Sequence, residues 1–425
     1  MRLKFATGSV ALGTAAALAF ATAIPAQAAD PGVTRNKIVI GTTTPLTGPA
    51  SPGYKDIPVA AKAYFDYVNA NGGIFGRNID LRVFDDQYNP ALTKKGTSQL
   101  ILRDKIFAMY GALGTPTHSA VIQDLNRRGI PDVFVNTGGA SFDNPGKYPM
   151  TFPYFPSYIV ESKVMGYYMA NDPALNAKKK CLFYQDGEFG DNAKIGFKAA
   201  GTTFATTTSY FSGQQALGPF SAQINKLKSA GCELVVFFGV TSATAQLLGT
   251  AAKSGFAPTW MITSVGTDPS VLRGSLGEST SALMKGIYVP NFIAEAQDTR
   301  NPYVSQMRAI AKAAGLEWNF YTYYGINTAY VLAQALKAAG KNLTRTGLIN
   351  ALQTQSKNFR SAAVVPFVVN SKSHQGLTGY YMAQYNANLD AERLTKYIMV
   401  ATSSSSGKAQ KTTFRPAPPT KKLLP

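Results

Sequence analysis

The feature that most constrains the fold is a regular alternation of strand-like and helix-like segments along most of the chain. Short apolar runs at 37–41, 79–85 and 133–135 have the composition of buried strands, and a helical pattern at 59–69 stands between the first two. Such alternation predicts an α/β fold, with parallel sheets covered by helices on both faces. In these sheets ligands bind beyond the carboxyl ends of the strands, where the connecting loops leave.

A second set of such segments predicts a second lobe. The alternation restarts after a passage rich in Pro, Tyr and Phe at 148–158, and it continues to residue 263. A chain of 425 residues also exceeds what one hydrophobic core usually supports. Near the end, low apolar content with Ser, Pro and Lys predicts a disordered or loosely draped tail at 402–425.

The beginning of the chain has the pattern of a signal peptide. Arg2 and Lys4 form a short basic head, an apolar run extends to Ile24, and Ala26 and Ala28 form a small-x-small cleavage site. The sequence therefore predicts a signal peptide at 1–28 and a periplasmic or secreted location. Because no cysteine stands near the cut, we expect no lipid anchor, and no later run is apolar and long enough to span a bilayer.

The chain is strongly basic. Its formal net charge is +19, and removal of Arg2 and Lys4 with the signal would leave +17. This charge fits attraction to anionic ligands or to an anionic envelope surface, although we favour a generally solvated basic surface. Nucleic acid is a poor fit because the charges are dispersed along the chain.

Residues for metal binding or catalysis are sparse. The two histidines, His118 and His374, stand far apart and without cysteine partners, so we expect no metal site and no cofactor. The chain also lacks a GxSxG motif. The pair Asp85 and Asp86 fits a solvated or helix-capping role better than acid–base catalysis. The sequence therefore predicts a binding protein and not an enzyme.

The cysteines are an even pair. Cys181 and Cys232 each stand directly before an apolar, strand-like run. If those runs are parallel neighbours, both thiols lie at the same edge of the sheet. We therefore predict a disulfide, which would close a loop of about 50 residues and contribute roughly 3 to 4 kcal/mol in the chain-entropy model.

The stretch 107–128 predicts the centre of a binding site, because it has the pattern strand, glycine turn, helix. Thr115 has the chemistry of an N-cap and Pro116 fits the first helical position, so we expect the helix to start at Pro116. The free amides of Thr117 and His118 would then face the mouth of the sheet and could hold a carboxylate. In the alternative, Thr115 only caps the helix and water takes the remaining amides.

Further hydroxyls, amides and aromatic rings are expected at the same edge of the two sheets. This combination suits holding a small molecule better than transforming it. The candidates are Thr115, Thr117, Gly138 and Ala140 from one lobe, and Phe189 and Thr241 from the other.

Several segments also follow one another in a fixed order between about residues 37 and 400. They read IVIGTTTPLTGPAS, NANGGIFGR, DDQYNP, YGALGTPT, VNTGGASF, YQDGEFGD and VVFFG. The ordered set resembles the periplasmic binding proteins of branched-chain amino acid type, which are solute-binding components of ABC importers. The resemblance implies a type I periplasmic binding protein fold, with two discontinuous Rossmann-like lobes and a hinge of three strands.

The resemblance also implies the limits of the lobes. The N-terminal lobe would comprise 36–155 and 290–377, and the C-terminal lobe would comprise 156–289 and 378–401. The three crossovers would fall near 153–157, 288–291 and 376–380. In such proteins the lobes close on the ligand like a hinge, and a membrane permease recognises the closed form.

Roles of single residues follow from the resemblance. Thr115 matches the hydroxyl residue that takes the ligand carboxylate, with help from the Thr117 amide. Gly138 and Ala140 match a loop that offers backbone groups. Tyr54 lies near the position of an aromatic wall, and Tyr158 is a further candidate for this wall. Phe189 matches an aromatic ring that covers the ligand from the second lobe, and Thr241 falls in the opposing loop.

Two departures bear on the ligand. Val265 stands where amino-acid binders of this family place a glutamate for the ligand ammonium, and Ala140 stands where a hydroxyl is usual, although Ser141 is adjacent. We therefore expect a carboxylate with an apolar or aromatic body, such as an aromatic acid, an aliphatic acid or a small amide. In the alternative, the ligand is a branched-chain amino acid. The charge would then come from Asp186, Glu188 or Asp268.

The predicted function is capture of this solute, by a monomer, for the permease of an ABC importer. An extracytoplasmic sensor of the same fold, which reports its ligand state to a regulator or receptor, is the alternative.

Overall fold

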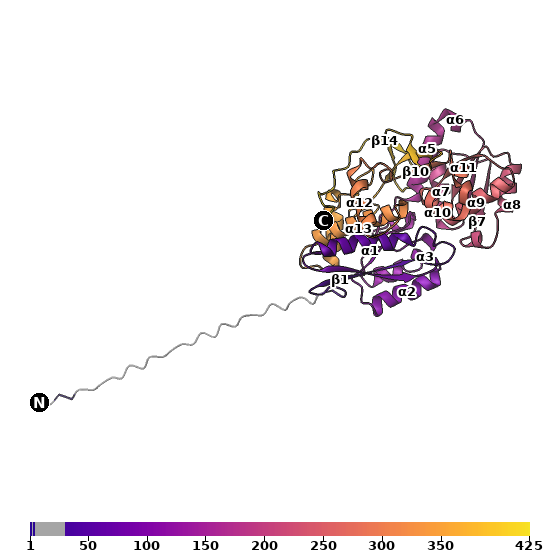
Figure 1. Ribbon diagram of the computed structural model, residues 1–425. Coiled ribbons are helices and arrows are strands. Elements are labelled where there is room, and N and C mark those ends of the chain that lie inside the picture. Colours follow the sequence, from indigo (N-terminus) through magenta and orange to yellow (C-terminus); the bar gives the residue numbers. More distant parts are fainter. Residues whose placement is uncertain (2, 5–29) are drawn as a thin grey trace.

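The computed structural model describes residues 1, 3–4 and 30–425 (Figure 1). The apolar run and the cleavage site of the predicted signal peptide lie outside the described residues. Within the described part of the chain, no helix combines the length and apolar character that a membrane span requires.

The first lobe is built on a parallel sheet in the order β2-β1-β3-β4-β5. Its two long strands run in register, with Lys37 opposite Asn78 and Thr44 opposite Asp85. Strands β3 and β4 are buried along their whole length, as expected for strands covered on both faces. The bounds are β1 Lys37–Thr44, β2 Asn78–Asp85, β3 Ala108–Tyr110, β4 Asp132–Val135 and β5 Thr151–Pro153.

Helices from two distant parts of the sequence cover this sheet. The helix α13 (Phe320–Ala338) is buried along most of its length and packs against α1 (Asp56–Ala70). The two backbones come close at Gly325, where an added Cβ would lie 2.5 Å from the carbonyl oxygen of Ile57. The other helices of this lobe are α2 Pro90–Leu102, α3 Thr115–Ser119, α4 Ile122–Arg127, α12 Pro302–Ala313 and α14 Arg345–Gln355.

The second lobe is built on a mixed sheet in the order β14-β13-β11-β10-β9-β8-β6-β7, with β12 paired to β11. Strands β10, β9, β8, β6 and β7 are parallel, and β11 runs antiparallel to β10. The strands are β6 Lys180–Gln185, β7 Thr206–Tyr210, β8 Leu234–Phe238, β9 Thr259–Ile262, β10 Tyr288–Asn291, β11 Gly379–Tyr385, β12 Ala391–Arg393, β13 Ile398–Val400 and β14 Gln410–Thr412. The helices are α5 Tyr158–Asn171, α6 Pro173–Asn176, α7 Glu188–Ala200, α8 Ser221–Ser229, α9 Thr241–Lys253, α10 Pro269–Leu276 and α11 Thr280–Met284.

The chain passes between the lobes after β5, after β10 and before β11, so each lobe is discontinuous in sequence. In the second lobe, Cys181 of β6 and Cys232, just before β8, form a disulfide with Cα atoms 5.8 Å apart. The two cysteines meet because β6 and β8 are parallel neighbours with Cys181 opposite Val235.

Residues 402–425, which we call the C-terminal strap, contact both lobes. On the second lobe, β14 pairs with β13, and the Lys163 ammonium donates to the carbonyl oxygen of Thr402 at 2.9 Å. On the first lobe, Leu423 is fully buried and its carbonyl oxygen accepts from the Tyr64 hydroxyl at 2.8 Å. In this structure the C-terminal strap is draped over both lobes, because its few apolar side chains and its carbonyl groups find partners there.

Candidate ligand-binding site between the lobes

Thr115 begins the short helix α3 at the carboxyl end of the first sheet. The turn before it depends on Gly114, which has a φ of 101° and whose added Cβ would lie 2.4 Å from the ring of Tyr88. The Thr115 hydroxyl is buried and shares a hydrogen bond of 2.6 Å with the hydroxyl of Thr137. Thr137 in turn donates weakly to the Tyr158 hydroxyl at 3.4 Å.

The predicted geometry of this helix needs three corrections. The helix begins at Thr115 with Gly114 as its N-cap, so Thr115 does not cap it. It ends at Ser119, and α4 starts at Ile122, so a single long helix does not form. The amide of His118 donates to the carbonyl oxygen of Gly114 at 3.0 Å and is therefore not free.

What remains available at α3 is a pair of amides. Among the described residues, the amides of Thr115 and Thr117 donate no hydrogen bond. The Thr117 hydroxyl, by contrast, donates to the carbonyl oxygens of Leu113 and Gly114 within its own turn. A helix of this length has little macrodipole, so an anion would be held by the two N–H groups themselves.

The loop after β4 contacts the second lobe directly. The amide of Ala140 donates to Oδ1 of Asn192 at 2.7 Å, and Asn192 lies on α7. The amide and hydroxyl of Ser141 donate to the two carboxylate oxygens of Glu188 at 2.9 and 3.0 Å. These predicted ligand residues therefore join the two lobes in this structure.

Aromatic rings lie beside this loop. Gly138 packs directly against the start of α5, where its carbonyl oxygen accepts from the Tyr158 amide at 2.8 Å. The rings of Tyr158 and Phe189 have centroids 4.4 Å apart, and Phe189 also contacts Phe238. Burial raises the pKa of Tyr158 to about 12, so its hydroxyl stays a hydrogen-bond donor at neutral pH.

Tyr54, Thr241 and Val265 form a second group between the lobes. The carbonyl oxygen of Val265 accepts from the Tyr54 hydroxyl at 2.9 Å and from the Thr241 hydroxyl at 3.1 Å. A fourth residue, Tyr321 at the start of α13, hydrogen-bonds Thr241 and was not predicted. Gly53 makes room for its ring, since an added Cβ would lie 2.1 Å from Cε2 of Tyr321.

Three further residues near the site were missed by sequence reasoning. Thr137 pairs with Thr115, Asn192 holds the Ala140 amide, and Tyr88 lies against Gly114. Tyr88 has a φ of 60°, and its amide donates to Oδ1 of Asp86 at 3.0 Å. The only signal for Tyr88 was its place in the segment DDQYNP.

The acid pair serves loop geometry, and the solvated or helix-capping role expected from the sequence is wrong for Asp86, because Asp86 is buried and Asn89 caps α2. Asp85 accepts from the amides of Leu46 and Thr47, at 2.9 and 3.3 Å. Asp86 is fully buried and accepts from the Thr93 hydroxyl at 2.9 Å, and burial raises its pKa to about 6. Both carboxylates thus fix the loops that surround the candidate site.

None of the candidate partners for a ligand ammonium is a free, buried carboxylate. Asp186 is exposed, and Glu188 is bound to Ser141. Asp268 caps α10 and also accepts from the amide of Phe320 at 2.8 Å. Glu161, which was not considered, is fully buried and accepts from the Ser264 amide at 2.7 Å.

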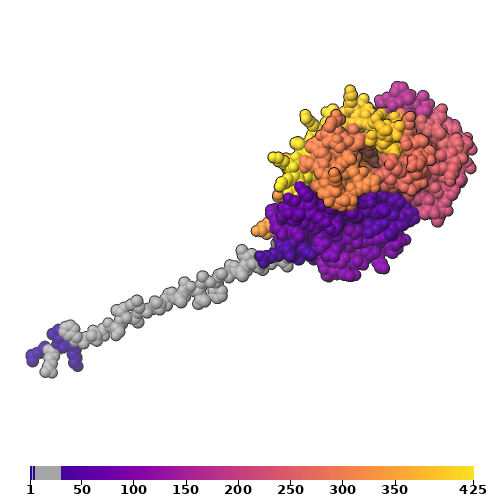
Figure 2. All heavy atoms as spheres, viewed as in Figure 1, coloured from indigo at the N-terminus to yellow at the C-terminus, as the bar shows by residue number. Residues whose placement is uncertain are grey.

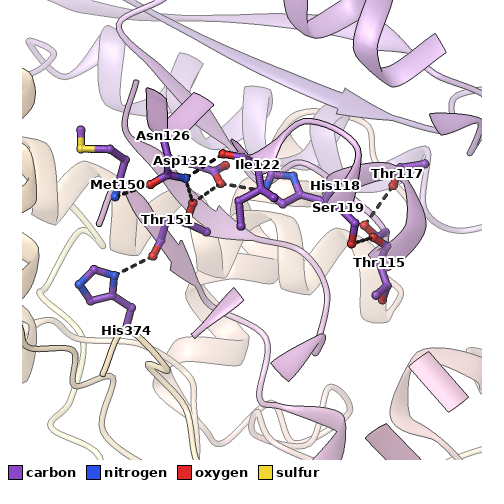
Figure 3. A network of polar contacts seen from close by, with 11 residues as sticks. Thr115, Thr117, His118, Ser119, Ile122, Asn126, Asp132, Met150, Thr151 and His374 are labelled. Carbon is purple, nitrogen blue, oxygen red and sulfur yellow. Dashed lines mark hydrogen bonds and ion pairs between the residues drawn. The ribbon is translucent and has the colours of Figure 1, made fainter. Parts of the chain in front are cut away.

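The two histidines are structural (Figure 3). Nε2 of His118 lies 2.7 Å from Oδ2 of Asp132, and both side chains are buried. The Thr151 hydroxyl donates to the same carboxylate oxygen at 2.8 Å, and Nδ1 of His374 donates to the carbonyl oxygen of Thr151 at 2.8 Å. This network ties α3 to β4, β5 and the segment before β11. The Ser119 hydroxyl donates to the carbonyl oxygen of Thr115 in its own helix and not to His118.

Comparisons with known proteins agree with this architecture. The sequence profile of the family described as "Periplasmic binding protein" matches residues 37–390. A relative named Leu/Ile/Val-binding protein homolog 3, from Brucella melitensis, is 29% identical over 215 residues, which are 50% of this chain and 56% of the relative. The chain therefore spans little more than half the length of that relative. A protein of Pseudomonas aeruginosa named amino acid binding protein is 24% identical over 72% of this chain and 79% of its own length.

Solved structures show the same fold. A branched-chain amino acid ABC transporter structure from Thermus thermophilus, with bound valine, has a TM-score of 0.75 at 18% identity and covers 87% of this chain and 98% of its own. A fatty acid ABC transporter substrate-binding protein from Thermomonospora curvata has a TM-score of 0.68 at 21% identity and covers 93% of this chain and 97% of its own.

Proposed function

The chain belongs to the periplasmic binding proteins of the branched-chain amino acid type, and we propose that it captures a small carboxylate-bearing solute for an ABC importer. Members of this family bind substrates and are not enzymes. Their type I fold is the fold that the sequence predicted. The family is periplasmic, and we propose that the signal at 1–28 exports this chain.

The observation that carries the proposal is the set of hydrogen bonds between the lobes at the predicted ligand residues. Tyr54, Ala140 and Ser141 of the first lobe each donate to a residue of the second lobe. A solute between these loops would be enclosed when the lobes meet, as in hinge closure. We propose that this closed form, as a monomer, is what the membrane permease recognises.

The chemistry of the site favours an acid without an ammonium group. The Thr115 hydroxyl and the amides of Thr115 and Thr117 offer donors to a carboxylate, and Tyr158 and Phe189 offer apolar surface to its body. Val265 is apolar, and the carboxylate of Glu188 already has two donors. We therefore propose an aromatic acid, an aliphatic acid or a small amide as the ligand class.

A branched-chain amino acid is the second candidate, because relatives carry that name and one similar structure holds valine. The fatty acid name of another similar structure fits the first candidate. Thermal-shift assays with leucine, isoleucine and valine, against benzoate and a medium-chain fatty acid, separate the two. A ligand at a hundred times its Kd should add about 2.7 kcal/mol to the free energy of unfolding.

The proposed role of Thr115, which is to bind the ligand carboxylate, is tested by Thr115→Val. Loss of a hydrogen bond to a charged group should weaken binding by about 1.5 to 3 kcal/mol, measured by calorimetry with the stabilising ligand. Thr207→Val, at an exposed position of β7, is the matched control and should leave the affinity unchanged. Equal affinities of wild type and Thr115→Val would contradict this site. Loss of solute uptake on deletion of the gene distinguishes an importer component from a sensor.

A further inference from the structure

A cavity of about 450 Å³ opens between the lobes beside the hinge strands. Its walls come from α10 of the second lobe, from α12 and the start of α13 of the first, and from β10 and β11. In Figure 2 the surface is hollowed among the orange segments of this region. Of the residues named as ligand candidates, only Asp268 lines it, so this cavity is distinct from the site around Thr115.

The walls of this hinge cavity are strongly aromatic. The rings of Trp318 and Tyr323 have centroids 5.1 Å apart. Trp318 is fixed by a hydrogen bond of 2.9 Å from its indole N–H to the carbonyl oxygen of Ala296. The ring of Tyr381 already carries the guanidinium of Arg393 over its face, at 4.6 Å from the centroid. The aromatic residues that line the cavity are Trp318, Phe320, Tyr323, Tyr381 and Tyr385.

Two polar groups of the wall lack a partner among the described residues. The Tyr323 hydroxyl is fully buried and makes no hydrogen bond there. The carboxylate of Glu295 is half-buried and makes no hydrogen bond or ion pair within that part of the chain, and burial raises its pKa. A fully buried polar group without a partner is costly, so the Tyr323 hydroxyl marks a place where a ligand or water belongs. The half-buried carboxylate of Glu295 can still be hydrated, and it leaves a negative charge at the wall of the cavity.

The charges of the wall favour a cation. Glu295 and Asp390 contribute carboxylates, and a third, Asp268, already caps α10. Arg393 and Arg300 lie near Glu295 and oppose the rise of its pKa, but they do not line the cavity. The two basic residues of the wall, Arg273 and Arg308, are exposed and can leave their charge in solvent. Aromatic faces attract ammonium groups through the ring quadrupole, and such sites recognise quaternary ammonium ligands.

We propose that this cavity is a second binding site, which takes a small organic cation such as a quaternary ammonium compound. The cation would lie against Trp318, with Glu295 as its counter-charge, because the face of Tyr381 is taken by Arg393. Because the walls belong to both lobes, an occupant would favour the arrangement in which the lobes meet.

Calorimetry on the full mature chain tests the proposal with choline and with its neutral isostere, in which carbon replaces the ammonium nitrogen. We expect choline to bind at least about tenfold more tightly than the isostere. Equal binding of the two would overturn the proposal, since it would make the cavity merely apolar. No binding of choline at concentrations up to about 1 mM would overturn it as well.

Variants then assign the site. Glu295→Gln should weaken choline binding by about tenfold, and Trp318→Leu should weaken it similarly. Glu317→Gln, an exposed neighbour outside the cavity wall, should leave it unchanged, and an equal loss in this control would overturn the proposal. Thr115→Val should also leave choline binding unchanged, which separates a failure of this proposal from a failure of the proposed function.

Discussion

Replacement of Glu161 by glutamine should remove a pH-dependent part of the stability of this protein. Glu161 lies in the first turn of α5, with no exposed surface. Its carboxyl accepts from the Ser264 amide at 2.7 Å and from the Thr263 hydroxyl at 2.9 Å. The Tyr380 hydroxyl lies 3.4 Å away, at the start of β11. Burial raises the pKa of this carboxyl to about 7, because the charged form loses its hydration.

The sign and size of the effect follow from linkage. The carboxyl has an ordinary pKa of 4.5 when exposed and a pKa of about 7 in the folded protein, so the folded state binds the proton more tightly. Its contribution is therefore complete below pH 4.5 and is lost as the pH rises through about 7. At 1.36 kcal/mol for each pKa unit, the rise from 4.5 to about 7 corresponds to roughly 3 kcal/mol.

Urea denaturation of wild type and Glu161→Gln, at a series of pH values from about 5 to about 8, measures this difference. Glutamine keeps an acceptor oxygen for the Ser264 amide but has no proton to lose. The free-energy difference between the two proteins should change by roughly 3 kcal/mol across the series. Asp86, whose pKa is raised to about 6, is present in both proteins and cancels. A constant difference would refute the reasoning, as would an equal pH dependence for the exposed control Glu317→Gln.

Three further predictions concern the links within and between the lobes. Replacement of Cys181 and Cys232 together by serine should lower the free energy of unfolding by about 4 kcal/mol, since the disulfide spans 51 residues; urea denaturation checks this. Tyr54→Phe should weaken ligand binding by about 0.5 to 1.5 kcal/mol in calorimetry without loss of melting temperature, because its hydrogen bond joins the lobes. Truncation of 413–425 removes the buried side chain of Leu423 and should lower the free energy of unfolding by about 1.5 to 3 kcal/mol. It should also speed hydrogen exchange in α1, and unchanged exchange would show that the C-terminal strap does not stabilise this helix.

Local sequence patterns predict the bounds of a helix correctly where the segment is amphipathic and is flanked by capping or turn residues. The pattern at 221–229 predicts a helix, and α8 has the same bounds. The pattern at 328–339 predicts a helix that begins at Thr328, eight residues after the true start of α13 at Phe320. The first turns of α13 are rich in aromatic residues, which also favour strands. Its true start is set by Asn319, whose side chain accepts from the Thr322 amide at 2.8 Å.

The residues of the candidate site could be predicted only in part from the sequence. Tyr54, Thr241 and Val265 were placed by resemblance, and the structure brings them together. Tyr321 could not be found this way, because its contact with Thr241 depends on how α13 from the far end of the chain is packed. The sequence could not show that the carboxylate of Glu188 is already bound, because Ser141 of the first lobe comes to lie opposite it only in the folded protein.

Because each lobe is discontinuous in sequence, the order of synthesis limits when the first lobe can complete its folding. All strands of the first sheet are complete at Pro153, yet the helix α13 that covers it ends only at Ala338. While the 185 residues from Pro153 to Ala338 are synthesised, which is less than half of the 425-residue chain, the part of the sheet that α13 covers therefore stays exposed. The final residues must also emerge before Leu423 can occupy its place beneath Tyr64, so folding can be completed only after release.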